Sequence, residues 1–211
     1  SQSWTASFIA NTNKGRLELI RDFKKTYAIK LDYTIEKKYF SLIPSYREGE
    51  EARVGFFGGW TVSEALLLHI EGSLRGAIDD AAILVGGAYT LELGPTITVE
   101  FYHDGEGCTL KSIVQCFVPS FGNSEPADIL IRQNYLLMQY THTRIRDSIN
   151  LTLRWIRDLD DDSNRVIGIF EYDLSDRTQL FTISNVDVGN KDAEFGSLLN
   201  YSVMAGVRFT F

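Results

Sequence analysis

The amino-acid sequence predicts an all-β protein, an antiparallel up-and-down transmembrane β-barrel of about 12 strands. Three observations lead to this prediction. The chain ends in a segment that alternates apolar and polar residues up to the last residue, Phe211. Segments with the same alternation recur upstream, each roughly ten residues long, whereas strands of soluble sheets have about five or six. The connectors alternate between tight turns and longer polar loops, which is typical of barrels with short periplasmic turns and longer extracellular loops.

The C-terminal segment 201–211 has the clearest pattern. A half-buried strand of a soluble protein alternates in the same way, but here the apolar row is long and reaches the chain terminus, where soluble domains usually fray. One face carries Tyr201, Val203, Ala205, Val207, Phe209 and Phe211, and the other carries Ser202, Met204, Gly206, Arg208 and Thr210.

The upstream segments complete a set of about twelve predicted strands in one domain, 1–211. An even number places both termini on the periplasmic side. The predicted strands are 3–11, 15–23, 27–43, 51–62, 65–77, 80–92, 96–104, 130–143, 147–158, 164–174, 177–187 and 198–211. The predicted tight turns are 24–26, 62–65, 93–96, 144–148 and 174–178, and the predicted loops are 44–51, 75–80, 105–129, 158–164 and 188–197.

Composition is compatible with this fold without requiring it. Of the 211 residues, 44% are hydrophobic and 23% charged, which also fits a soluble protein. No apolar run approaches the ~18 residues of a transmembrane helix, but a transmembrane strand needs only about 9–11 residues. The aromatic content of 12% suits the interfacial belts of a membrane protein or an aromatic-rich β core. A net charge of −7 argues against nucleic acid as a partner.

Two cysteines, Cys108 and Cys116, lie in one segment. On one straight strand they would be about 26 Å apart, too far for a disulfide. An oxidising periplasm or cell surface would let them pair across a loop or a helical turn. The sequence leaves the bonded and the free states open.

If the apolar rows face lipid, the opposite rows line the interior of the barrel. A barrel of twelve strands lies between the eight-stranded kind, which side chains fill, and 16-stranded porins. We therefore expect a narrow aqueous pore whose charged residues select ions or small solutes. The alternative is that these charges pair and plug a stable barrel. The expected pore-lining residues are Lys30, Asp32, Arg53, His69, Glu71, Glu100, Arg154, Glu171 and Arg208.

Enzymatic and metal-binding patterns are weak. His142, Ser148 and Asn150 resemble the triad of an outer-membrane phospholipase, but His142 and Ser148 fall on opposite sides of a tight turn. His103 could bind a metal together with Asp104 and Glu106, but three residues of this kind are common at the rim of a barrel. The acidic run 158–162 could hold Ca²⁺ or form a solvated loop. No catalytic residue, metal site or cofactor is predicted, since metal-ligand spacings and phosphate-binding loops are lacking.

The terminal strand ending in 207–211 resembles the signal that the barrel assembly machinery reads in the bacterial outer-membrane β-barrel (porin-like) superfamily. Segments 89–107 and 134–140 are similar to strands flanking a long surface loop in uncharacterised porin-like barrels of environmental Gram-negative bacteria. The similarity covers 52–211. Those relatives are longer, so the chain is either a compact version or the C-terminal part of a larger barrel. The residues that carry the assembly signal are Tyr201, Val203, Val207, Phe209 and Phe211.

The resemblance implies an integral protein of the bacterial outer membrane. Its expected contacts are outer-membrane lipid, lipopolysaccharide and the barrel assembly machinery, and it leaves open an oligomer or a protein partner. The expected function is that of a passive channel for ions or small solutes. The alternatives are a structural barrel that anchors a protein partner, a barrel lipid hydrolase and a soluble lipocalin-like carrier.

Overall fold

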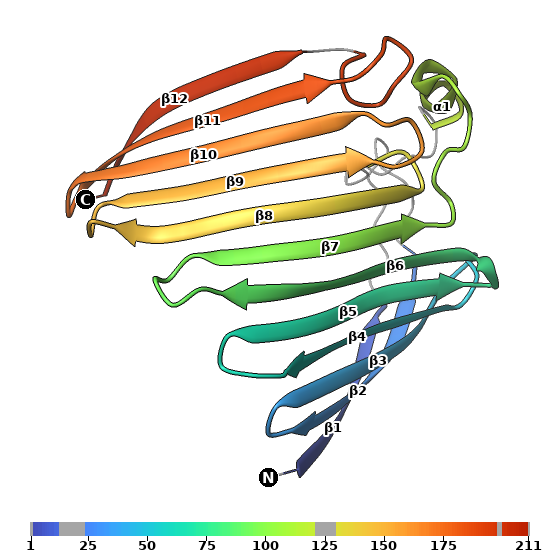
Figure 1. Ribbon diagram of the computed structural model, residues 1–211. Helices are drawn as coiled ribbons and strands as arrows, with labels where there is room; N and C mark the ends of the chain where they lie inside the picture. Colours follow the sequence, from blue (N-terminus) through green and yellow to red (C-terminus); the bar gives the residue numbers. More distant parts are fainter. Residues whose placement is uncertain (1, 13–23, 121–129, 198–199, 211) are drawn as a thin grey trace. The chain divides into compact units, whose positions relative to one another are not determined.

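The structure, a computed structural model, describes residues 2–12, 24–120, 130–197 and 200–210 (Figure 1). The chain divides into two compact units, which are described separately. The first unit comprises Ser1–Val85 and Asp104–Glu106, and the second comprises Gly86–His103 and Gly107–Phe211. Among the described residues, no helix has both the length and the apolar character needed to cross a membrane.

Twelve antiparallel strands follow one another in chain order within one sheet, from β1 to β12. The prediction of an all-β, antiparallel up-and-down fold with twelve strands is confirmed. Among the described residues β1 does not pair with β12, so the sheet is not closed.

Most strands of the first unit have nine or ten residues. They are β1 (Gln2–Asn11), β2 (Thr26–Ile35), β3 (Lys38–Arg47), β4 (Arg53–Thr61) and β5 (Leu66–Arg75), and β6 (Ala77–Thr90) runs from the first unit into the second. The second unit continues with β7 (Thr96–Asp104), β8 (Asn134–Ile145), β9 (Ile149–Asp158), β10 (Asn164–Ser175), β11 (Thr178–Val188) and β12 (Tyr201–Phe209). One helix, α1 (Ile113–Ser120), lies in the long connector after β7.

The predicted long strand 27–43 is wrong, because it consists of β2, a turn at Glu36–Lys37 and β3. The alternation changes phase at this turn. Apolar residues occupy odd positions before it and even positions after it, so that Tyr33 lies opposite Phe40. A single strand keeps one phase, and the change of phase was therefore the missed signal.

Other predicted boundaries also change. The predicted strand 15–23 lies entirely outside the described residues, and 24–26 leads into β2, which begins at Thr26. The predicted loop 44–51 is shorter, since Pro44 lies within β3 opposite Val54. The predicted loop 75–80 is wrong: Gly76 alone joins β5 to β6, with a φ of 58° that favours glycine.

The connectors of the second unit differ in length at the two ends of its strands. We call one end the turn end, where 91–95, 146–148 and 176–177 join the strands. At the other, the loop end, the connectors are 105–133, 159–163 and 189–200. Figure 1 shows α1 beside the red segment that follows β11, and the backbone N–H of Ile113 donates to the carbonyl of Asp192 there (2.9 Å).

The buried core of the second unit lies at the loop end and on one face of the sheet. Tyr135, Ile156 and Phe195 form its centre, and Tyr102, Leu130, Leu137 and Ile167 pack around them. The opposite face of the same strands has no such cover, because Leu153, Val166 and Val186 are exposed there. The core thus forms where the connector 189–200 folds onto the sheet.

Candidate functional site: the charged face and its cap

In the first unit, the expected pore-lining residues share one face of the sheet. The register aligns Asp32, Ser41, Phe57 and Glu71 in one cross-strand row. Since alternate residues of a strand point to the same face, Lys30 joins Asp32 on that face. Arg53 and His69 also belong to it, by their spacing from Phe57 and Glu71 along β4 and β5.

Specific contacts organise part of this face. The ammonium of Lys30 lies 3.0 Å from the Asp32 carboxylate, and the Ser41 hydroxyl donates a hydrogen bond to the same carboxylate. The Lys30 ammonium also lies 5.4 Å from the centre of the Phe57 ring. Tyr39 lies across Gly59, where a Cβ atom would come within 2.5 Å of the ring. Glycine at this position therefore makes room for the tyrosine.

In the second unit, the remaining four expected residues also share one face. Glu100 lies in a row with Leu137, Ile156 and Arg165, and Arg154 is two residues from Ile156 on β9. Glu171 on β10 and Arg208 on β12 are in phase with these rows. We call this side of each unit its charged face and the opposite side its apolar face.

Amide side chains hold two of these arginines. Arg154 donates from Nε and Nη2 to Oε1 of Gln139, at 2.9 and 2.7 Å. Arg208 donates to Oε1 of Gln179 at 3.0 Å, and Gln179 donates in turn to Asp173 at 2.9 Å. A ladder of polar side chains therefore crosses β10, β11 and β12 near the turn end.

Exposure is reversed relative to a water-soluble sheet, in which the apolar face is the covered one. From Thr26 to Asp32 on β2 and from Thr96 to Phe101 on β7, the residues of the apolar face are exposed and their neighbours on the charged face are half-buried. Ile29, for example, is 47% exposed, whereas the side chains of Lys30 and Asp32 are 34% and 26% exposed. On these two strands, large apolar side chains thus meet the surroundings, and charged side chains are partly shielded.

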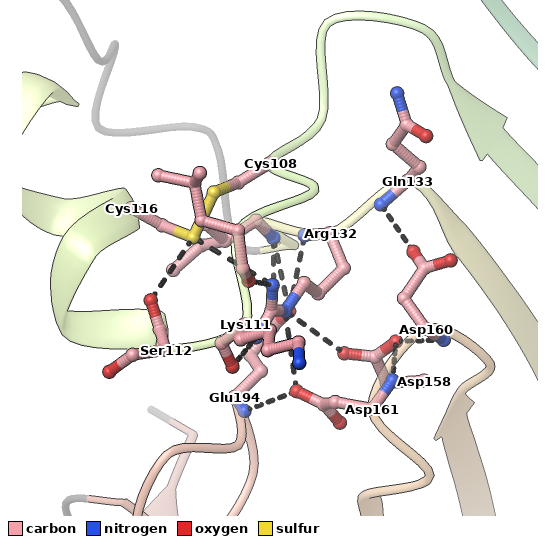
Figure 2. Close-up of a disulfide and its surroundings, with 12 residues drawn as sticks. Cys108, Lys111, Ser112, Cys116, Arg132, Gln133, Asp158, Asp160, Asp161 and Glu194 are labelled. Atoms are coloured by element: carbon pink, nitrogen blue, oxygen red, sulfur yellow. Dashed lines mark hydrogen bonds and ion pairs between the residues drawn. A yellow bond between two sulfur atoms is a disulfide. The ribbon is translucent and has the colours of Figure 1, made fainter.

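The loop end of the charged face carries a compact cap, which we define as residues 108–116, 130–133, 158–163 and 189–197. Within it, Cys108 and Cys116 form a disulfide with a Cα–Cα distance of 5.8 Å (Figure 2). Of the two states that the sequence left open, the structure has the bonded one. Cys116 lies on α1, so the helical turn brings the cysteines together. Closing so short a loop stabilises the cap by about 2–3 kcal/mol through chain entropy.

A single buried guanidinium, that of Arg132, joins three segments of the cap (Figure 2). It donates to the carbonyl oxygens of Leu110 and of Lys111, the latter at 3.2 Å. Its Nε lies 3.3 Å from the Asp161 carboxylate and 3.9 Å from that of Asp158. Arg132 is 2% exposed, so its charge is balanced by protein groups in the interior and not by bulk solvent.

Glu194 binds the cap from the connector 189–200. Its carboxylate accepts hydrogen bonds from the Tyr135 hydroxyl and from the backbone N–H of Ile131 (3.3 Å) and of Arg132 (3.3 Å). Its own N–H donates to Asp161 at 2.8 Å. Next to it, the Phe195 ring packs against Tyr135, with centroids 6.5 Å apart. Glu194 therefore links the last segment of the cap to 130–133 and to 158–163.

The acidic run 158–162 is not a solvated loop throughout. Asp158 is fully buried, and Asp160 accepts hydrogen bonds from the backbone of Gln133 (2.8 Å) and Asn134 (2.9 Å). Asp161 binds Arg132, whereas Asp160 and Asp162 are exposed, and Asp162 pairs with Arg157 at 2.7 Å. Among the described residues, no three His, Cys, Asp or Glu side chains are grouped as metal ligands.

The histidines do not form the arrangements considered from the sequence. Nδ1 of His142 lies 3.2 Å from the Tyr140 hydroxyl, and the Ser148 hydroxyl instead donates to the carbonyl of Arg146. His103 bonds to Asn134 at 2.8 Å, whereas Glu106 pairs with Arg75. The geometry therefore gives no support to a Ser–His pair or to a metal site at His103.

Comparison with family models, curated proteins and solved structures finds no match to this chain. Function must therefore be inferred from the geometry. The residues of the expected assembly signal that the structure describes, Tyr201, Val203, Val207 and Phe209, lie on the apolar face of β12 and are exposed. Phe211 lies outside the described residues.

Sequence reasoning missed the residues that build the cap, among them Arg132, Tyr135, Glu194 and Phe195. Arg132 falls within the predicted strand 130–143, but β8 begins at Asn134 and Arg132 precedes it; Glu194 lies in a connector without periodic patterning. For Tyr135 the pattern predicts only a place on a strand. Their importance depends on contacts 59 to 63 residues apart along the chain, such as the bond between Tyr135 and Glu194.

Burial and hydrogen bonds shift the pKa values of two carboxyl groups of the cap, Glu194 and Asp161, in opposite directions. Burial raises the pKa of Glu194 and outweighs the hydrogen bonds from Tyr135, Ile131 and Arg132 that favour its charged form. Burial also opposes the ionisation of Asp161, but hydrogen bonds from Ser163 and Glu194, together with the positive charge of Arg132, lower its pKa overall. Asp161 is therefore the charged partner of Arg132.

We expect the raised pKa of Glu194 to make the cap less stable as the pH rises. The folded cap binds the proton of the Glu194 carboxyl group more tightly than the unfolded chain does. The stabilisation from this proton is therefore present at low pH and is lost as the pH rises through the folded pKa. Glu194→Gln cannot ionise. The stability of the wild type minus that of Glu194→Gln should therefore decrease from about pH 4 to pH 8. Thermal midpoints in detergent at several pH values measure this difference, and a constant difference would contradict the prediction.

Proposed function

We propose that the chain forms a transmembrane β-barrel of the bacterial outer membrane and acts as a passive channel for ions or small solutes. In this proposal β1 pairs with β12, the apolar faces of both units meet lipid and the charged faces line the interior. The observation that carries the proposal is the reversed exposure along β2 and β7, where apolar side chains such as Ile29 and Val99 are exposed and the charged Lys30, Asp32 and Glu100 are half-buried. In a bilayer, lipid chains would contact the exposed apolar face, and water in the interior would solvate the charged face.

Two further features support an outer-membrane location. The disulfide Cys108–Cys116 requires an oxidising compartment, such as the periplasm or the cell surface. Aromatic residues lie near both ends of the apolar rows in the first unit, with Tyr27 opposite Tyr46 at one end and Trp4 opposite Tyr33 at the other. Tyrosine and tryptophan at these positions suit the two interfaces of a membrane.

The charged faces favour small, hydrophilic solutes. Acidic and basic residues occur on both, and Arg154 and Arg208 are held by amide oxygens rather than by carboxylates. Their guanidinium groups therefore keep their charge available to a passing anion, while Glu171 offers a site to a cation. Charges at such close quarters select solutes by charge and size.

The second candidate is a structural barrel that is closed by its own side chains. The cap favours it, because Phe195 and Tyr135 pack on the charged face at the loop end. This barrel would anchor a protein partner and would not conduct. The remaining alternatives, a lipid hydrolase and a soluble carrier, gain no support from the contacts of His142 or from the exposed apolar faces.

Planar-bilayer recording of the refolded full chain tests the proposal. We expect discrete conductance steps in KCl, a reversal potential under a salt gradient and heat-modifiable mobility on gels. Absence of conductance from protein with heat-modifiable mobility would favour the structural barrel. Protein that stays monomeric in buffer without detergent would contradict the membrane assignment altogether.

A further inference from the structure

The cap contacts the charged face of the second unit and leaves the apolar face bare. Tyr102 and Tyr135 lie opposite each other on β7 and β8, two residues from the row of Glu100 and Leu137. Their ring centroids are 6.2 Å apart, and Phe195 of the cap packs on Tyr135. The Arg165 guanidinium, in the same row as Glu100, lies 4.6 Å from the centre of the Phe195 ring. The cap is thus seated on the side that would face the interior of the barrel.

The seat of the cap is itself built from paired charges and apolar groups. Arg165 binds Asp187 through two hydrogen bonds of 2.7 and 2.9 Å, and Asp187 is 7% exposed. Ile156, in the next row position, is also buried. Side chains of the cap already cover this part of the charged face, so it offers no surface to a hydrated solute.

The side chain of Arg132 links its own segment of the cap to two others. Its guanidinium reaches 108–116 through the carbonyl oxygens of Leu110 and Lys111, and 158–163 through Asp161. The same Asp161 accepts the backbone N–H of Glu194, which extends the link to 189–197. No second cation replaces Arg132 in the ion pairs that the structure describes for Asp158 and Asp161. Loss of this one side chain leaves buried carboxylates without a counter-charge.

We propose that the cap is a plug that restricts passage at the loop end of the channel, and that the side chain of Arg132 holds the segments of the plug together. This inference rests on the proposed channel function. It assigns the restriction to residues 108–116, 130–133, 158–163 and 189–197 rather than to the charges along the strands. The disulfide Cys108–Cys116 fixes the shape of segment 108–116, to which Arg132 donates hydrogen bonds.

Single-channel recording of three proteins tests the plug: the wild type, Arg132→Ala and the control Arg157→Ala. Arg157 also forms an ion pair at the loop end, with Asp162, but this pair is exposed and holds no second segment. We expect Arg132→Ala to raise the conductance by about twofold or more, since removing a constriction widens the limiting section of a pore. Arg157→Ala should conduct as the wild type does.

A second measurement reports whether the cap has opened. Lys191 is an exposed residue of the cap, and trypsin should cleave after it faster in Arg132→Ala than in the wild type. Heat-modifiable mobility shows that the barrel is still folded. If Arg132→Ala fails to fold, the double variant Cys108→Ser/Cys116→Ser provides the same comparison, because it frees the segment 108–116.

The outcomes separate the plug from the channel. Higher conductance together with faster cleavage at Lys191 supports the plug. A folded variant that is cleaved faster but conducts like the wild type overturns the plug and leaves the channel intact. Absence of conductance from all proteins, even with the cap released, overturns both.

Discussion

Leu153→Arg is expected to destabilise the protein in a bilayer by about 2–4 kcal/mol, the cost of an arginine on the lipid face near the midplane. Leu153 lies in the middle of β9, opposite Tyr140 and Gly168, and is 45% exposed on the apolar face. In a bilayer the added guanidinium would have to displace lipid or bend toward an interface. The free energy of unfolding from phospholipid vesicles, measured by denaturant titration, gives the size of the effect.

The neighbouring residue supplies a matched control. Thr152 lies on the charged face, opposite Thr141 and Ile169, two residues from Arg154. Thr152→Arg adds the same side chain to the same strand, but toward the proposed interior, and we expect it to change the stability by less than about 1 kcal/mol. Equal and small effects of both substitutions would contradict the membrane assignment, because a water-exposed apolar face accepts arginine without cost.

Arg132→Ala is expected to destabilise the cap by about 3–5 kcal/mol, as removal of one partner of a buried ion pair does. The cost arises because Asp161 and Asp158 lose their counter-charge and two backbone carbonyls lose their donor. Thermal unfolding of the cap, followed by near-ultraviolet circular dichroism of the buried Tyr135, on which Phe195 of the cap packs, measures the change. The exposed pair of Arg157 and Asp162 is the control, and Arg157→Ala should cost about 1 kcal/mol or less.

A double variant tests the cause of this loss. Arg132→Ala/Asp161→Asn removes the uncompensated charge together with the arginine, so it should be less destabilised than the sum of the two single variants. Additive losses would mean that Arg132 acts through packing and not through charge. The same variants at low ionic strength and at high salt should differ little, because salt screens buried pairs weakly.

The strand pattern was predictable because its cause is local. Alternate residues of a strand point to opposite faces whatever the rest of the chain does, so Lys30 and Asp32, or Glu171 and Asp173, could be assigned to one face from spacing alone. The same reasoning failed where the phase of the alternation changes, between Ile35 and Lys38. It also failed at Gly76, where one residue joins two strands.

The cysteines show the limit of distance arguments from sequence. Spacing excluded a disulfide within one straight strand, but it could not choose between a bonded pair in a loop and two free thiols. The choice depends on α1, whose turn brings Cys116 within 5.8 Å of Cys108 between Cα atoms. The start of α1 is held by a distant residue: the hydroxyl of Ser112, just before the helix, donates to the carboxylate of Asp192, 80 residues further along the chain.

The antiparallel up-and-down order and, outside 27–43, the residues of a strand that share a face follow from the sequence, because both depend on the period of two and on short connectors. The position of the buried core and the pairing of charges follow from the tertiary structure alone. Glu194 and Phe195 lie in a connector, and Arg132 precedes β8 although it falls in the predicted strand 130–143, so their positions depend on contacts between segments far apart in the chain. Such contacts are set by the fit of side chains in three dimensions, which a one-dimensional pattern does not contain.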